Sequence, residues 1–177
     1  EYADAGAVSC VGINDVDASQ HVVSQLADGG RKRIALINHD LSYKYASLRE
    51  RGYKSVIHLR DLDYQAVEYA SELSSSAGMA AMQNLLTANP PDAVFAVSDT
   101  LAAGALRAIQ QAGLRVPEDI AVVGFDGTEL AEMISLTTIE QPSRDIGRKA
   151  VNLLLNKIDN PDAPTERVMM DWRFISR

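Results

Sequence analysis

The sequence predicts an α/β fold built around a parallel β-sheet, and two observations carry this prediction. Short apolar runs rich in β-branched residues alternate along the chain with longer segments whose apolar residues recur at helical spacing. Glycine, proline or asparagine stands at most of the junctions between them. Strands that alternate with helices in this way form βαβ units, whose right-handed crossovers make neighbouring strands parallel.

The first third of the chain is predicted to contain three strands separated by two helices. We expect Asp17 to cap the first helix, because its short side chain can accept a free amide hydrogen of the first turn. Gly29 and Gly30 are expected to end that helix. We expect Ser42 to cap the second helix and Gly52 to end it. The strands are the apolar runs at residues 7–13, 33–38 and 55–59.

The rest of the chain is predicted to alternate in the same way after an irregular stretch. Residues 60–75 are polar, and we expect an excursion there with one helical turn near residues 65–69. We favour Asp99 as the cap of a helix that Gly113 ends. Further strands are expected at residues 93–97, 120–124, 136–139 and 168–175. Further helices are expected at residues 76–88, between Asp99 and Gly113, and at residues 142–158.

Length, charge and cysteine content exclude several classes of protein. The 177 residues suffice for one sizeable domain and part of a second. The formal net charge is −7, and an acidic surface makes the chain by itself a poor candidate for binding nucleic acid. The single cysteine, Cys10, excludes an internal disulfide and favours a reducing cytoplasm. No apolar run has membrane-spanning length and no signal peptide is visible, and the start without methionine suggests a piece of a longer protein.

Asp126 is the first candidate for a functional side chain. It follows a predicted buried strand, at the end where open α/β sheets bind ligands, and its carboxylate can accept hydrogen bonds from ligand hydroxyls. Alternatively it caps its own turn, with Gly127 supplying the backbone freedom. The sequence Phe125–Thr128 also suits an aspartyl-phosphatase loop of the haloacid-dehalogenase type. Such a loop needs a nucleophilic aspartate at position 124, where this chain has glycine, so phosphoryl chemistry is not expected.

Two further residues have both a structural and a functional interpretation. Ser98 ends an apolar strand and can cap the following helix or face a ligand. Arg49 is either a solvated surface charge or a donor of several hydrogen bonds inside a cleft. The histidines have no partner at metal-ligand spacing, and no phosphate-binding glycine motif is present, so we expect no metal and no nucleotide cofactor.

Four segments carry a resemblance to a known family. They read VFAVSDTLAAGAL at residues 94–106, GLRVPEDIAVVGFD at residues 113–126, LTTIEQP at residues 136–142, and Ile146-Gly147. With them the chain resembles the effector-binding domain of the lactose-repressor (LacI/GalR) family of bacterial transcription regulators. The resemblance implies a fold like that of periplasmic sugar-binding proteins: two flavodoxin-like subdomains, each a doubly wound parallel sheet, joined by three crossovers. An effector would bind between them, and an amino-terminal headpiece would bind operator DNA.

On this pattern the chain divides into four parts. Residues 1–12 correspond to the end of the amino-terminal subdomain and a crossover, and residues 13–139 to the carboxyl-terminal effector-binding subdomain. Residues 140–167 correspond to a second crossover and a helix of the amino-terminal subdomain, and residues 168–177 to the last strand of the carboxyl-terminal subdomain. We therefore expect most of the amino-terminal subdomain and the headpiece to lie outside this sequence.

The resemblance also implies a set of ligand-binding residues. Arg49 and Asp126 match the arginine and aspartate of the family's cleft, and Ser98 occupies a cleft position that is often asparagine. Leu73 falls where some members place an aromatic ring that stacks on the ligand. Asn14 belongs to the first crossover, where this chain reads Asn-Asp and the family usually reads Asp-Asn.

These residues predict a non-enzymatic sensor of a small sugar or sugar phosphate. The effector would shift the hinge between the subdomains and so change the affinity of a cytoplasmic homodimer for operator DNA. A periplasmic-type sugar-binding protein of the same fold is the first alternative. A phosphatase-type enzyme is the second, and Gly124 argues against it.

The helix expected at residues 142–158 has an apolar stripe whose usual packing partners would be absent. An exposed stripe of this length forms a hydrophobic patch. We expect the helix to dock elsewhere, to be disordered or to meet a second copy of the chain. The stripe consists of Ile146, Ala150, Leu153, Leu154 and Ile158.

Overall fold

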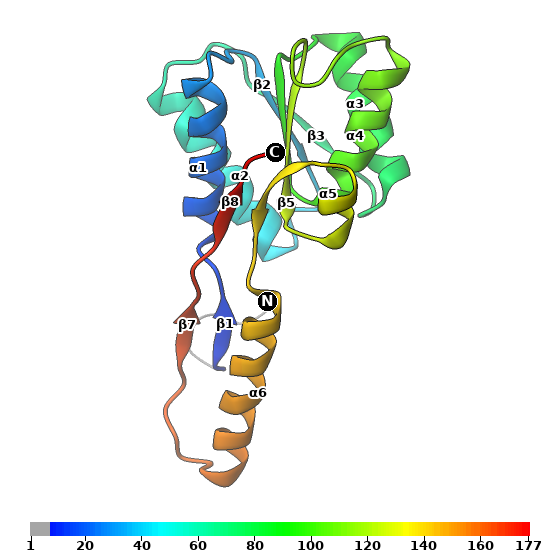
Figure 1. The fold of residues 1–177 in the computed structure, drawn as a ribbon. Helices are drawn as coiled ribbons and strands as arrows, with labels where there is room; N and C mark the ends of the chain where they lie inside the picture. Colours follow the sequence, from blue (N-terminus) through cyan, green and yellow to red (C-terminus); the bar gives the residue numbers. More distant parts are fainter. Residues whose placement is uncertain (1–7) are drawn as a thin grey trace.

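The computed structural model describes residues 8–177, in which eight strands and six helices alternate (Figure 1). The strands are β1 (Cys10–Gly12), β2 (Ile34–Asn38), β3 (Ala66–Tyr69), β4 (Ala93–Ala96), β5 (Ala121–Asp126), β6 (Thr137–Glu140), β7 (Arg167–Met169) and β8 (Arg173–Ile175). The helices are α1 (Asp15–Asp28), α2 (Lys44–Leu59), α3 (Ser75–Ala88), α4 (Asp99–Gln111), α5 (Glu129–Met133) and α6 (Ser143–Asp159).

Six strands form the main sheet, in the order β3-β2-β4-β5-β6-β8. Neighbours are parallel except for β6 and β8, which pair antiparallel. The chain passes from β2 outward to β3 and then returns to the other side of β2 for β4. This reversal is the topological switch point of a doubly wound sheet, and it confirms the predicted flavodoxin-like fold class.

Two helices cover each face of the main sheet. In Figure 1, α1 and α2 lie on one side of the strands and α3 and α4 on the other. Every residue of β2 and β4 is buried, because both faces of these central strands are covered. We call this part, with α5, the main unit.

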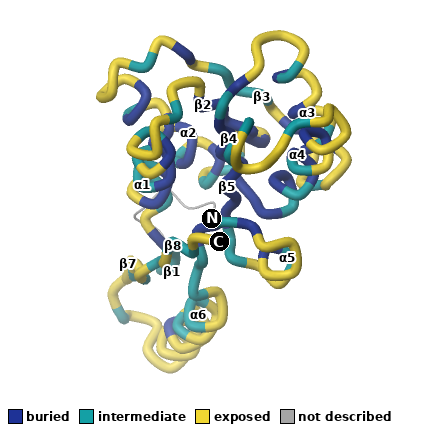
Figure 2. Tube along the Cα trace, turned by 45° about the horizontal axis from the view of Figure 1, so that its top comes forward, coloured by how far each residue is buried: buried dark blue, intermediate teal, exposed yellow. Residues whose placement is uncertain are grey.

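A small second unit, made of β1, β7 and α6, extends from the main unit (Figure 1). β1 and β7 form a separate parallel pair, with Cys10 opposite Arg167. α6 packs on β1, but Leu153 is its only buried residue in the described chain. The helix is continuous and its apolar stripe is largely exposed, with Leu154 60% and Ile158 64% accessible; Figure 2 colours most of this helix as exposed. That a second copy covers it stays a prediction.

The structure corrects the predicted path between residues 42 and 75. Residues 55–59 are not a strand but the last turns of α2, which continues through Gly52. Gly52 does not end this helix; it lets α2 approach α1, since a Cβ there would lie 2.6 Å from the Val16 carbonyl oxygen. Tyr53, Val56 and Ile57 are buried on one helical face, a pattern that a short apolar run does not distinguish from a strand. The edge strand β3 replaces the helical turn predicted near residues 65–69.

Other boundaries and caps also differ from the prediction. The predicted strand at residues 168–175 is two strands in different sheets, β7 and β8, and the short helix α5 was not foreseen. Asn14, not Asp17, caps α1: its Oδ1 accepts the Asp17 amide hydrogen at 3.3 Å. Tyr43 precedes α2 without a side-chain cap, whereas the Ser42 amide donates to Asp40. Among the described helices, none has both the length and the apolar character to cross a membrane.

The predicted strand at residues 7–13 falls partly outside the described residues, as does the predicted first part of the chain, residues 1–12. Its described portion contains β1, which is shorter than predicted.

Candidate functional site

A cleft of about 650 Å³ lies where the main unit meets the second unit. It is lined by residues 10–16, by the first turns of α2 with Tyr45 and Arg49, and by Gln141 and Met169. Because β2, β4 and β5 are parallel, their carboxyl ends share one edge of the sheet. Arg49 connects this edge to the cleft.

Arg49 projects from α2 and is buried, with its side chain 6% exposed. Its Nε donates to Asp15 Oδ1 at 2.8 Å, and its Nη1 donates to the Val97 carbonyl oxygen at 2.6 Å and to Asp126 Oδ1 at 3.4 Å. The guanidinium also lies 3.5 Å from the centroid of the Phe125 ring, a cation–π contact. The alternative interpretation of Arg49 as a solvated surface charge is therefore wrong.

Asp126 is the last residue of β5, and its side chain remains 32% exposed. Its Oδ1 accepts hydrogen bonds from Gln141 Nε2 at 2.7 Å and from Arg49. Its φ is 112°, a conformation that non-glycine residues rarely adopt. Burial, together with the negative charge of Asp99, raises the pKa of Asp126 to about 6, although Arg49 and Gln141 act to lower it.

Ser98, and not the favoured Asp99, is the cap of α4. Ser98 caps α4, accepting the Leu101 amide hydrogen at 3.2 Å. Asp99 is not the cap; it is fully buried and accepts the Thr128 amide hydrogen at 2.7 Å, the Thr128 hydroxyl at 2.8 Å and the Thr138 hydroxyl at 2.6 Å. Sequence reasoning missed this arrangement because its partners lie 29 and 39 residues away.

Gly124 is also explained by Asp99. A Cβ at residue 124 would lie 2.6 Å from Asp99 Oδ1 and 2.7 Å from Leu136 Cδ2. The position that a phosphatase would need for its nucleophile therefore has no room for a side chain.

The remaining predicted ligand residues are Asn14, Ser98 and Leu73. Asn14 lines the cleft and is exposed. Ser98 is buried, and Leu73 is 47% exposed in the loop before α3; neither lines the cleft. Asp126 is not a lining residue either, and it is tied to the cleft through its hydrogen bonds from Arg49 and Gln141, which do line it. The sequence reasoning missed Tyr45, which lines the cleft with its ring 5.0 Å from the Arg49 guanidinium. The two tyrosines in Tyr43-Lys44-Tyr45 were the available signal, since aromatic side chains are common in ligand pockets.

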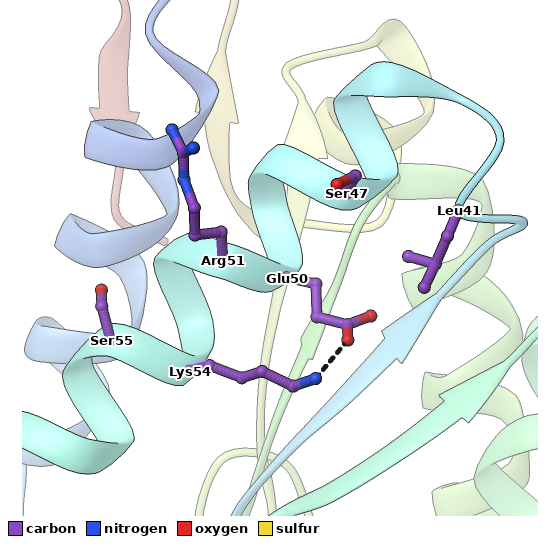
Figure 3. Close-up of a pocket in the computed structure, with 6 residues that line it drawn as sticks. All are labelled: Leu41, Ser47, Glu50, Arg51, Lys54 and Ser55. Carbon is purple, nitrogen blue, oxygen red and sulfur yellow. Dashed lines mark ion pairs between the residues drawn. The ribbon is translucent and has the colours of Figure 1, made fainter.

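A second hollow, of about 450 Å³, lies beside α2 near the buried Glu50 (Figure 3). Figure 3 shows the Glu50 carboxylate meeting the Lys54 amine, at 2.6 Å. Glu50 also accepts hydrogen bonds from Asn38 and Tyr69. Burial acts to raise the pKa of Glu50, but the bonds from Lys54, Asn38 and Tyr69 hold it below its ordinary value. With its oxygens engaged inside the protein, Glu50 is a structural residue.

The histidines are spread over the main unit. His21 packs against Trp172 and Phe174 at ring distances of 5.2 and 5.1 Å, His39 lies near Tyr45, and His58 is exposed. Within residues 8–177, no three histidine, cysteine or acidic side chains gather as a metal site would require.

Comparison with known proteins matches most of the chain to one family. Residues 23–177 match the family described as "Periplasmic binding protein-like domain". The ribose operon repressor of Haemophilus influenzae is 40% identical over 158 residues, which are 86% of this chain and 47% of that repressor. The chain thus spans about half the length of the curated relatives that it matches.

Solved structures show the same fold. A LacI family transcriptional regulator from Enterococcus faecium with bound ribose superimposes with a TM-score of 0.91 at 27% identity, over 100% of this chain and 66% of that one. The lac repressor dimer bound to operator and the anti-inducer ONPF superimposes with a TM-score of 0.87 at 29% identity, over 94% of this chain and 59% of the repressor.

Proposed function

Because the chain belongs to the periplasmic-binding-protein-like domains that form the effector-binding part of LacI-family regulators, we propose that it senses a small sugar for such a regulator. The observation that carries the proposal is the buried Arg49, bonded to Asp126 beside the cleft. The curated relatives are repressors and not enzymes, which favours this function over a phosphatase-type enzyme or a periplasmic-type sugar-binding protein.

The proposed ligand contacts use one atom of Arg49 and one of Asp126 that make no hydrogen bond to the described residues. Among residues 8–177, the hydrogen bonds of Arg49 engage Nε and Nη1, so Nη2 is left to donate to a sugar oxygen. Those of Asp126 engage Oδ1, so Oδ2 is left to accept from a sugar hydroxyl. Both contacts would be charge-assisted and therefore stronger than neutral hydrogen bonds. The ring of Tyr45, which lies over the Arg49 guanidinium, lines the cleft beside them.

Of the other predicted contacts, one lines the cleft and two lie outside it. The Asn14 amide group can donate into the cleft, because its hydrogen bond to the described residues uses Oδ1, which caps α1. Ser98 and Leu73 stay predictions, which need a ligand that extends beyond the cleft of this chain.

We propose that the effector acts on the hinge between two subdomains. Three segments pass between the main unit and the second unit, at residues 13–14, 141–142 and 170–172 (Figure 1). A ligand that contacts both sides favours one hinge arrangement in proportion to its difference in affinity for the two. In a cytoplasmic homodimer with a DNA-binding headpiece, this shift would change operator affinity.

Calorimetric titration of the full-length protein with D-ribose tests the proposal. We expect Asp126→Asn to weaken ribose binding by about 10–100-fold, because a hydrogen bond to a charged group contributes about 1.5–3 kcal/mol. We expect the fold to persist, since asparagine is among the residues that best tolerate positive φ. Equal affinity of the two proteins would refute the assignment of Asp126.

Ribose affinity should also depend on pH. The raised pKa means that lowering the pH through about 6 protonates Asp126, whereas an ordinary aspartate would remain ionised until about pH 4. The ionised form is the better acceptor for sugar hydroxyls, so we expect affinity to fall below pH 6, approaching about tenfold per pH unit. Titrations from pH 8 to pH 5 measure this, and Asp126→Asn should lose the dependence.

A further inference from the structure

The carboxylate of Asp99 is buried, and none of the proposed ligand contacts uses it. It is the first residue of α4 and fully buried, and a buried charge is costly unless it is well hydrogen-bonded. Its three donors come from two other parts of the main unit: the Thr128 amide and hydroxyl follow β5, and the Thr138 hydroxyl belongs to β6. Asp99 therefore joins α4 to the strand end that carries Asp126.

The residues between β5 and Thr128 have an unusual backbone. Asp126 has φ 112° and Gly127 has φ 68°. Gly127 is also pressed against β6, because a Cβ there would lie 2.5 Å from the Glu140 Cα. A non-glycine residue keeps a positive φ only where its surroundings impose it. Here the turn is held on one side by Glu140 and on the other by the bonds from Thr128 to Asp99.

The same turn sets the direction of the Asp126 side chain. In this conformation the Asp126 carbonyl oxygen accepts the Gln141 amide hydrogen at 3.2 Å, and its carboxylate meets Gln141 Nε2 and Arg49. We infer that Asp99 is a positioning residue for the effector site: by clamping Thr128, it holds Asp126 in the conformation that meets Arg49 and the ligand. The ligand part of this inference rests on the proposed function; the conformation of Asp126 does not.

Gly124 supports the inference independently. The Asp99 carboxylate occupies the space that a side chain at residue 124 would need. Glycine in the middle of a buried strand weakens the strand, so its presence needs a reason, and the close approach of Asp99 supplies one. The glycine thus leaves room for the Asp99 carboxylate and its hydrogen bonds from Thr128 and Thr138, which we call the clamp.

Two variants of Asp99 separate the clamp from the charge. In Asp99→Asn, Oδ1 can still accept both Thr128 hydrogen bonds, and Nδ2 can donate to the Thr138 hydroxyl, so the clamp survives without the charge. We expect ribose affinity at pH 7.5 within about threefold of wild type. In Asp99→Ala the clamp is lost, and we expect a fall of tenfold or more, comparable to Asp126→Asn, as a lost hydrogen bond to a charged group implies.

A pair of variants at Thr128 decides the question should Asp99→Ala fail to fold. Thr128→Ser keeps the hydroxyl and serves as the matched control, whereas Thr128→Val removes one bond of the clamp and keeps the size of the side chain. We expect ribose binding to weaken about threefold to tenfold in Thr128→Val and to remain unchanged in Thr128→Ser.

Carbon NMR of the Asp126 carboxyl group, without ligand, provides a readout that mere stability would not move. Among the described residues, the charges that shift the pKa of Asp126 are those of Arg49 from α2 and Asp99 from α4, and Glu140 lies opposite Asp126 on β6. Asp99→Asn removes the like charge, so we expect the pKa of Asp126 to fall below its wild-type value, while Thr128→Ser leaves it unchanged.

The outcomes distinguish this inference from the proposed function. If the wild-type protein binds no ribose, the proposed effector is wrong, and the Asp126 resonances still test the clamp in the unliganded protein. The inference is overturned if Thr128→Val folds and keeps the wild-type position and titration of those resonances, or if Asp99→Ala folds and its Asp126 resonances match those of Asp99→Asn. It is equally overturned if these variants bind ribose as wild type does.

Discussion

Replacing Arg49 with alanine is expected to abolish ribose binding and to lower the free energy of unfolding by about 3–5 kcal/mol, the usual cost of removing one partner from a buried charge pair. The guanidinium bonds Asp15, Asp126 and the Val97 carbonyl oxygen at once. Without it, the carboxylates of Asp15 and Asp126 lose the cation that they share, and the Val97 carbonyl oxygen loses its donor. Urea unfolding and calorimetric titration of the same preparation measure the two effects.

Arg60→Ala is the matched control for the loss of an arginine charge. Arg60 is paired with Asp28 on the surface, with both side chains about half exposed, and such pairs contribute about 0–1 kcal/mol. Arg49→Lys should fall between wild type and Arg49→Ala, because one ammonium group cannot satisfy the three acceptors in the geometry of a guanidinium. If Arg49→Ala destabilised the fold no more than Arg60→Ala, the linking role of Arg49 would be wrong.

Gly104→Ala is expected to lower the free energy of unfolding by about 2–3 kcal/mol. α3 and α4 cross at Gly104 and Gly78, and a Cβ on Gly104 would fall on the Ser75 carbonyl oxygen and within 2.6 Å of the Met79 nitrogen. These are backbone atoms, so α3 itself would have to move away. Overpacking costs about 1–3 kcal/mol and occasionally more, and we expect about 3–4 kcal/mol here because backbone must move. The helix propensity of alanine offsets about 1 kcal/mol of this cost.

Gly147→Ala is the control that isolates this helix crossing. Gly147 also lies within a helix, α6, but a Cβ there meets no atom within 4 Å. In this chain we expect the control to raise the free energy of unfolding by up to about 1 kcal/mol through helix propensity alone. Urea unfolding followed by circular dichroism compares the two variants; a Gly104→Ala protein as stable as wild type would show that the crossing can relax.

The sequence predicted the central buried strands well because turn residues bound their apolar runs on both sides. Residues 33–38 and 93–97 are short apolar runs between turn residues, and β2 and β4 lie there. The strand predicted at residues 55–59 was wrong, because Val56 and Ile57 continue the buried face of helix α2. Earlier residues of that face are Arg49 and Tyr53. A buried arginine breaks the apolar stripe that would have revealed the helix.

The candidate site was predictable only in part. The position of Asp126 after a buried strand pointed to a ligand, and the family resemblance supplied Arg49. The burial of Asp99 could not be foreseen, because its donors come from Thr128 and Thr138, which local patterns do not connect to it. The positive φ of Asp126 has the same cause: it is imposed by contacts across the sheet and is not encoded in the residue itself.

The antiparallel pairing of β8 with β6 sets an order of events during synthesis. Arg173, opposite Glu140, follows it by 33 residues, and all of α6 intervenes. While the ribosome makes that stretch, β6 has an open edge, and such edges attract other chains. During this interval the growing chain exposes both the unpaired edge of β6 and the apolar face of α6. We therefore expect ribosome-bound chains stalled before residue 173 to be the species that chaperones engage most strongly.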